Sequence, residues 1–295
     1  MGNGDNAVER PALGLALGGG GARGYAHIGV LRVLQRHGIP VGAIAGTSMG
    51  AVVGAAYAAG VDLDRLERLL RELDLNRLLR FPRRSLRRLL TNTATDVFTG
   101  RRDWRREELP STQKLVEFFS LFGKNKTFED LSIPLAVMTT DIDTGELVVL
   151  RHGPIDRALA AAVSLPGIHY PVELNGRFLV DGGLVDNLPV AAATDLGADR
   201  VLAVDVEAPL KDDPAVTSMD VLMRAEKILL RELNRLRLQR DRQRLGDRLV
   251  VIHPEAHDVH MLDLGEVDGP IQAGEREAER RSSDIRALLD SAPAS

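Results

Sequence analysis

The chain has 295 residues, of which 44% are hydrophobic and 27% charged, and its formal net charge is −4. This is long enough for a large α/β domain with a substantial core, and the negative charge gives no overall attraction to nucleic acid. No cysteine is present, which excludes disulfides, thiol catalysis and cysteine-ligated zinc and fits a reducing compartment.

The first residues lack the charged-then-apolar pattern of a signal peptide. The uncharged stretch Gly38–Val61 resembles a membrane span in length, but Pro40, polar residues and several glycines interrupt it. We therefore expect buried strand, turn and helix there, in a cytoplasmic protein.

Apolar runs and helix-boundary signals predict strands that alternate with helices. The expected strands are Ala12–Leu17, Val41–Ala45, Pro134–Thr139, Leu147–Arg151, Arg177–Val180, Val201–Asp205 and Leu249–His253. The expected helices are Ala22–His37, Met49–Ala59, Leu63–Leu73, Ile155–Val163, Val190–Leu196, Asp220–Gln243 and Pro270–Leu289. Such alternation is typical of a three-layer α/β/α fold with a central, mostly parallel sheet, and without repeats or a linker we expect one domain.

A glycine loop follows the first strand. Its residues Gly19-Gly20-Gly21-Ala22-Arg23-Gly24 match G-x-G-x-x-G, and a loop of this kind before a helix binds anions through backbone N–H groups. A dinucleotide site needs an acidic residue about 20 positions further on. No acid occurs between Gly24 and Asp62, and the loop has no lysine for a P-loop. Nucleotide binding is therefore disfavoured.

A serine elbow follows the second strand. Gly46-Thr47-Ser48-Met49-Gly50 matches G-x-S-x-G between a strand and a helix, which is the context of a nucleophile elbow. The alternative is a tight turn with a capping serine. The position of the elbow favours Ser48 as a nucleophile, but only one clear strand precedes its own, which differs from an ordinary α/β-hydrolase.

The segment Arg77–Arg106 departs from this pattern because it holds ten arginines against two acids, with leucines, Phe81 and Trp104 between them. One interpretation is a solvated pair of basic helices. The other is a lid or interfacial segment attracted to anionic head groups. Nucleic-acid binding is the weaker interpretation because aromatic residues for base stacking are scarce.

An Asp-Gly-Gly turn ends the strand Arg177–Val180. We expect Asp181 to point into the crevice at the carboxyl ends of parallel strands, with Gly182 and Gly183 allowing a sharp turn. The alternative is an Asx-turn. The late histidines, His253, His257 and His260, leave open a metal site or a triad histidine, but we expect a surface loop.

The chain resembles the patatin-like phospholipase family, because the glycine loop, the serine elbow and the Asp-Gly-Gly turn occur in the order typical of that family. Ala161–Val172 also resembles a family segment, although Ala162 stands where the family has serine; Asn187 and Pro189 resemble the residues after the turn. The resemblance covers about residues 12–205. We expect 206–295 to form a helical and strand extension packed on the same domain.

The resemblance implies a Ser48–Asp181 dyad, with Ser48 as nucleophile and Asp181 as general base, which hydrolyses lipid acyl esters without cofactor or metal. Backbone N–H groups of Gly20, Gly21 and Ala22 would stabilise the oxyanion, in a loop completed by Gly19, Arg23 and Gly24. Glycines 46, 50, 182 and 183 would shape the elbow and the turn. Arg23 would either hold the loop or contact a phosphate.

The implied partners are a lipid ester and the inner face of a membrane, reached through Arg77–Arg106, and we expect no nucleic-acid partner. The helix Asp220–Gln243 leaves open membrane contact, a homo-oligomer or ordinary core packing. Two other functions remain open: a Ser-His-Asp esterase of non-lipid esters and a catalytically silent lipid-binding module.

Overall fold

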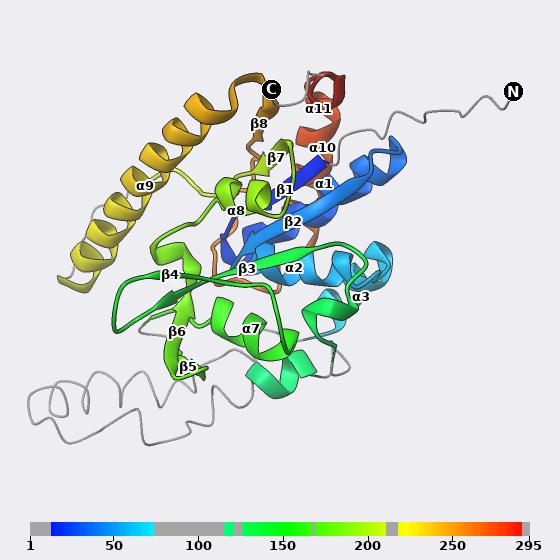
Figure 1. Ribbon diagram of the computed structural model, residues 1–295. Helices are drawn as coiled ribbons and strands as arrows, with labels where there is room; N and C mark the ends of the chain where they lie inside the picture. Colours follow the sequence, from blue (N-terminus) through cyan, green and yellow to red (C-terminus); the bar gives the residue numbers. More distant parts are fainter. Residues whose placement is uncertain (1–12, 74–114, 121–125, 167–168, 211–217, 291–295) are drawn as a thin grey trace, which may run out of the picture.

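The computed structural model describes residues 13–73, 115–120, 126–166, 169–210 and 218–290 (Figure 1). The basic segment Arg77–Arg106, interpreted above either as a solvated pair of helices or as an interfacial lid, lies outside these residues.

One eight-stranded sheet forms the centre, in the order β5-β6-β3-β2-β1-β7-β8 with β4 paired to β3. The strands are β1 (Leu13–Leu17), β2 (Val41–Thr47), β3 (Leu135–Asp141), β4 (Leu147–Leu150), β5 (Val172–Leu174), β6 (Arg177–Asp181), β7 (Arg200–Val204) and β8 (Leu249–Ile252). All seven expected strands are confirmed, and β5 was missed. Its signal was Asn175-Gly176, the dipeptide of a two-residue hairpin turn, and both residues have positive φ.

The sheet is mixed but mostly parallel. The pairs β1–β2, β1–β7, β2–β3 and β7–β8 are parallel, whereas β3–β4, β3–β6 and β5–β6 are antiparallel. Because β8 pairs with β7, residues beyond 206 contribute to the same sheet as the rest of the chain.

The α-helices labelled in Figure 1 are α1 (Ala26–Arg36), α2 (Met49–Ala58), α3 (Leu63–Glu72), α7 (Ile155–Ala162), α8 (Val190–Asp195), α9 (Ser218–Leu245), α10 (Asp268–Arg280) and α11 (Ser282–Asp290). The single helix expected over Pro270–Leu289 is wrong, because it breaks at Arg281, before two serines that favour helix ends over interiors. The helix expected from Ala22 begins as the 3₁₀ turn Gly21–Tyr25.

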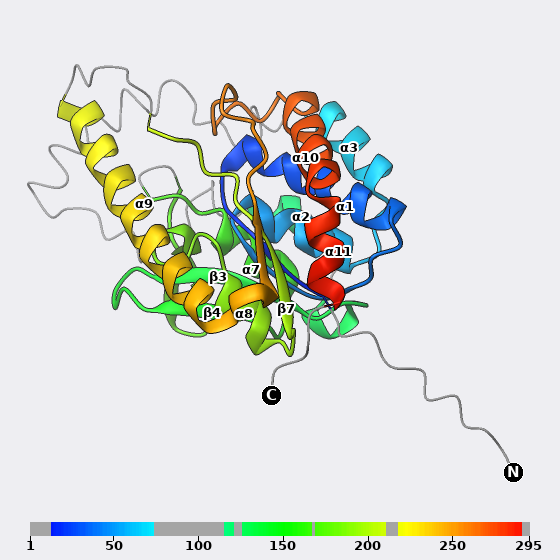
Figure 2. The same cartoon turned by 90° about the horizontal axis from the view of Figure 1, so that it is seen from above.

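Alternation along the strands builds the three layers. On β1, Leu13, Leu15 and Leu17 pack into the core beneath α1, α2 and α10, whereas Ala16 faces the smaller core beneath α8 and the end of α9. Figure 2 shows these helix groups on opposite sides of the sheet. Small residues on the second face let α8 lie close, so the fold is a three-layer α/β/α sandwich.

None of the helices in the described ranges combines the length and apolar character needed to cross a membrane.

Candidate active site

The elbow has the strained geometry that exposes a nucleophile. Ser48 lies between β2 and α2 with φ 53° and ψ −125°, a conformation rarely adopted by residues other than glycine, and its side chain is half-buried. A Cβ at Gly46 would lie 2.6 Å from Ala51 N, and one at Gly50 would lie 2.2 Å from Leu17 O. Both positions therefore require glycine, because α2 starts directly against the end of β1.

Asp181 lies at the same end of the central strands as Ser48, but its own strand runs in the opposite direction to β2 and β3. The expected parallel strand is wrong here, since β6 runs antiparallel to β3 and pairs Asp181 with Thr139. On the other side of β3, Thr47 pairs with Met138. β3 extends past the end of β2, so β6 can run inward along it and end at the level of the elbow. Ser48 and Asp181 therefore flank β3.

The backbone around Asp181 holds its carboxylate in place. Asp181 N donates to Ser164 O at 3.0 Å, and Gly183 N donates to Asp181 Oδ1 at 2.8 Å. A Cβ at Gly182 would lie 2.6 Å from the carbonyl carbon of Met138, so only glycine fits against β3. Gly183 is less confined, because a Cβ there would lie 3.0 Å from the side-chain oxygen Oδ1 of Asn187. The Asx-turn and the functional interpretation of this motif are thus compatible.

Burial makes Asp181 a stronger base than an ordinary carboxylate. The residue is 3% exposed, and desolvation raises its pKa to about 6, against the opposing effects of Ser48 and of Gly183 N–H. Asp181 Oδ2 is buried without a hydrogen-bond partner, so Ser48 lies near enough to lower the pKa but is not joined to Oδ2 by a bond of ordinary geometry. An unpaired oxygen beside a serine hydroxyl is suited to accept its proton.

Contacts from three elements hold the glycine loop. Gly18 N donates to Val204 O at 3.0 Å, and Gly19 N donates to Asn187 O at 3.1 Å. Asn187 Nδ2 donates to Gly19 O at 3.2 Å. His27, fully buried with its pKa lowered to about 4 by desolvation, bonds Gly18 O through Nε2 at 2.8 Å. With a pKa of about 4, His27 is neutral at neutral pH, and because a carbonyl only accepts, its proton is on Nε2.

Two of the three expected oxyanion donors remain available. Ala22 N already donates to Met261 O at 2.9 Å, so this part of the expectation fails in the observed loop. Gly20 N and Gly21 N have no hydrogen-bond partner among the described residues. Gly21 has φ +58° and a Cβ there would lie 2.0 Å from Met261 O, whereas one at Gly24 would lie 2.6 Å from Met49 Cβ.

Arg23 faces carboxylates rather than open solvent. Its side chain is half-buried, and desolvation lowers its pKa while Glu207 and Asp205 raise it. Both acids follow β7, next to the loop. This environment favours a role for Arg23 in holding the glycine loop.

The late histidines have neighbours of their own. His253 Nδ1 is 3.4 Å from Asp205 Oδ2, and His260 Nδ1 accepts from Leu262 N at 3.3 Å. These contacts join His253 and His260 to residues other than Ser48 and Asp181. Among the described residues, no group of three or more His, Asp or Glu is arranged to hold a metal. The backbone of this segment nevertheless matters, because Met261 O anchors Ala22.

Residues outside the three motifs support the glycine loop and the turn at Asp181. Asn187 was noted only as part of a family-like segment, and Ser164 and His27 were not singled out as site residues, although each bonds the backbone of a site element. Met261 gave no signal in the sequence.

Gly19→Ala should lower kcat at least about a hundredfold, because a misplaced oxyanion donor costs roughly that much. Its Cβ would lie 2.4 Å from Asn187 Oδ1 and 3.1 Å from Ser48 Cβ, which forces the loop away from the serine. Ester hydrolysis measures the effect. Gly269→Ala is the control, since its Cβ would approach only the flexible end of Glu266 at 3.1 Å. Equal activity of both variants would contradict this account of the loop.

Comparisons with known proteins identify the family of this chain. The family model described as patatin-like phospholipase matches residues 15–194. An uncharacterized NTE family protein of Mycobacterium tuberculosis is 36% identical over 213 residues, which cover 70% of this chain and 54% of that protein. Lysophospholipase NTE1 of Scheffersomyces stipitis is 36% identical over 208 residues, which cover 68% of this chain and 12% of that protein. The chain thus spans about half the length of the mycobacterial relative.

Among solved structures, VipD from Legionella pneumophila has a TM-score of 0.54 at 17% identity, over 96% of this chain and 67% of that one. At this identity the likeness concerns the fold alone.

Proposed function

The chain belongs to the patatin-like phospholipase family, and from this premise we propose that it hydrolyses acyl esters of phospholipids, lysophospholipids or acylglycerols through Ser48 and Asp181. The observation that carries the proposal is the buried carboxylate of Asp181, whose pKa is raised to about 6, beside a serine held in a strained elbow. His253 faces Asp205 instead, with Nδ1 3.4 Å from Oδ2, which disfavours His253 as the histidine of a Ser-His-Asp triad.

In the proposed reaction, Ser48 Oγ attacks the ester carbonyl while its proton passes to Asp181 Oδ2. The tetrahedral oxyanion accepts hydrogen bonds from Gly20 N and Gly21 N, and the positive end of α2 adds to the stabilisation. The intermediate collapses to an acyl-serine, and the proton on Asp181 goes to the leaving alcohol. Water then attacks the acyl-serine, giving its proton to Asp181, and Ser48 regains a proton as the fatty acid leaves.

A fluorophosphonate probe tests this assignment, since it phosphonylates only an activated serine. We expect one labelled serine, located by peptide mass spectrometry at Ser48, and hydrolysis of a lysophospholipid that stops when the probe has reacted. If the folded protein hydrolyses no ester and is not labelled, the proposed hydrolase activity is refuted and a catalytically silent lipid-binding module is favoured.

A further inference from the structure

The long helix α9 exposes an apolar stripe that nothing in the described part of the chain covers. Leu222 and Leu229 are 62% and 70% exposed, and Val221, Ile228 and Leu236 are at least 49% exposed. Leu222, Ala225, Leu229 and Leu236 recur at intervals of three, four and seven residues, so they lie along one face of the helix. A contiguous apolar surface of this kind marks an interaction site.

A line of cations runs beside the stripe. Arg224, Arg231, Arg235 and Arg242 recur at intervals of seven, four and seven residues and therefore follow the adjacent face. Glu232, the acid within the stripe, is neutralised by Arg235, which donates two bonds of 2.8 and 2.6 Å to it. Arg242 makes no ion pair with any described residue.

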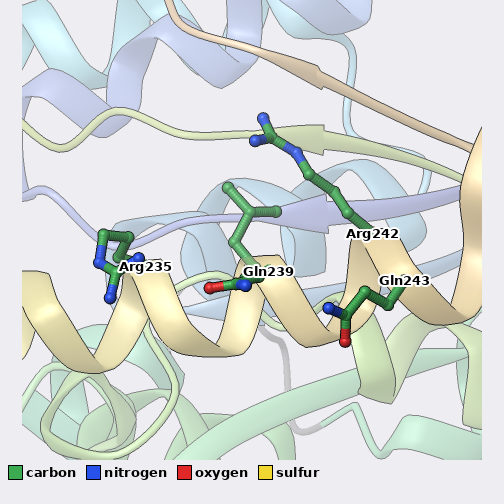
Figure 3. A pocket seen from close by; sticks show the side chains of 5 residues that line it. Arg235, Gln239, Arg242 and Gln243 are labelled. Carbon is green, nitrogen blue, oxygen red and sulfur yellow. The ribbon is translucent and has the colours of Figure 1, made fainter.

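A surface hollow of about 560 Å³ lies on the same helix, lined by Arg235, Leu238, Gln239, Arg242 and Gln243 (Figure 3). Its side chains offer N–H donors and one leucine, so it suits an anionic head group next to an acyl chain. The helix as a whole carries eight arginine and lysine residues against four acids, in a chain of net charge −4.

The inner face of α9 contacts both loops that support the catalytic serine. Asn234 Nδ2 donates to Glu207 Oε2 at 2.9 Å, and Glu207 faces Arg23 of the glycine loop. Arg237 lies 3.5 Å from Asp186 Oδ2, and the Asp186 carbonyl accepts from Thr47 Oγ1 at 2.8 Å. Figures 1 and 2 both show α9 along the outside of the molecule, with its N-terminal half projecting from the other labelled elements. The stripe is thus on a helix that adjoins the catalytic edge.

We propose that α9 docks the protein on an anionic lipid bilayer, with the apolar stripe entering the interface and the arginine line contacting lipid phosphates. The inference rests on the proposed lipid substrate, which must be reached at an interface. A second copy of this chain suits the surface less well, because a two-fold pair of α9 helices would place two net-positive surfaces against each other.

Vesicle flotation in the Ser48→Ala background tests the proposal without lipid breakdown. Vesicles of phosphatidylcholine with phosphatidylserine should bind the protein, and Leu222→Ser with Leu229→Ser should weaken binding by about tenfold or more. Arg231→Gln with Arg242→Gln should cost about fivefold per residue on these vesicles and nothing on pure phosphatidylcholine. Ile142→Ser, which removes another exposed aliphatic side chain, should bind like the parent.

The proposal is overturned if the parent does not float, or if the double leucine variant floats equally well. It is also overturned if that variant only turns a dimer into a monomer in sedimentation while vesicle binding persists. With Ser48 restored, the leucine variant should hydrolyse a water-soluble short-chain ester at the parental rate and vesicle lipid more slowly. Failure of wild type to hydrolyse the soluble ester would refute the proposed function and leave the docking result standing.

Discussion

Replacing Ser48 with alanine should reduce ester turnover by on the order of 10⁴-fold or more, since it removes the proposed nucleophile that forms the acyl intermediate. The fold should persist, because the side chain of Ser48 makes no cap hydrogen bond to α2. The measurement is hydrolysis of a short-chain ester and of a lysophospholipid, together with fluorophosphonate labelling, which should disappear.

A matched control uses another serine with a structural hydrogen bond. Ser132 Oγ donates to Ala58 O at 2.8 Å on a part-buried surface away from the elbow. Ser132→Ala should keep wild-type labelling and activity within a few-fold. Full turnover in Ser48→Ala would exclude Ser48 as nucleophile and direct attention to another residue.

Replacing Asp181 with asparagine should lower kcat/KM by about 10³–10⁴-fold, as the loss of a base that activates serine typically does. Asparagine fills the same space and its carbonyl still accepts from Gly183 N, but it takes no proton. In wild type, the raised pKa of about 6 predicts that kcat/KM rises with pH through about 6 and is level above it, because only the ionised carboxylate is a base. The residual activity of the variant should lack this step.

Asp186 supplies the control for that substitution. Burial also raises its pKa to about 6, but its charged neighbours are Arg237, Asp241 and Arg240, and its side chain has no interaction with Ser48. Asp186→Asn should retain activity within about tenfold. If both variants lose activity equally, then the general disturbance of this segment, rather than base catalysis, explains the result for Asp181.

Thermal unfolding separates loss of function from loss of fold in Asp181→Asn. Below the unfolded pKa of about 3.9 the carboxyl is protonated in both states, so burial then carries no ionisation penalty. Above about 6 the buried group must be ionised, which costs about 3 kcal/mol at most. The variant should therefore be more stable than wild type at pH 8, and the difference should fade between pH 6 and 4. A less stable variant at pH 8 would contradict the desolvated carboxylate.

Motifs that act locally could be read from the sequence. The elbow Gly46–Gly50 and the loop Gly19–Gly24 each lie between a strand and a helix, so strand pattern and glycine spacing were sufficient to predict their geometry. The absence of an acidic residue between Gly24 and Asp62 also argued against nucleotide binding from the sequence alone. These features depend on neighbours only a few residues away in the chain.

Features that depend on distant neighbours were not predictable in the same way. The predicted parallel direction of β6 was wrong, because the direction of a strand follows from its pairing with other strands and not from its own residues. Ala22 was expected to donate to the oxyanion, yet its N–H is taken by Met261, which lies more than two hundred residues later. The exposed face of α9 was left open, because its leucines look alike in sequence whether they face the core or solvent.

The sequence alone therefore determined the candidate functional groups, which are a serine elbow, an anion-binding loop and one carboxylate in an α/β chain. Tertiary structure decided how these parts meet. β3 extends past β2, which lets Asp181 arrive on an antiparallel strand beside Ser48 and be buried there. Burial of this carboxylate raises its proton affinity, and burial is a property of the folded surroundings rather than of any residue in isolation.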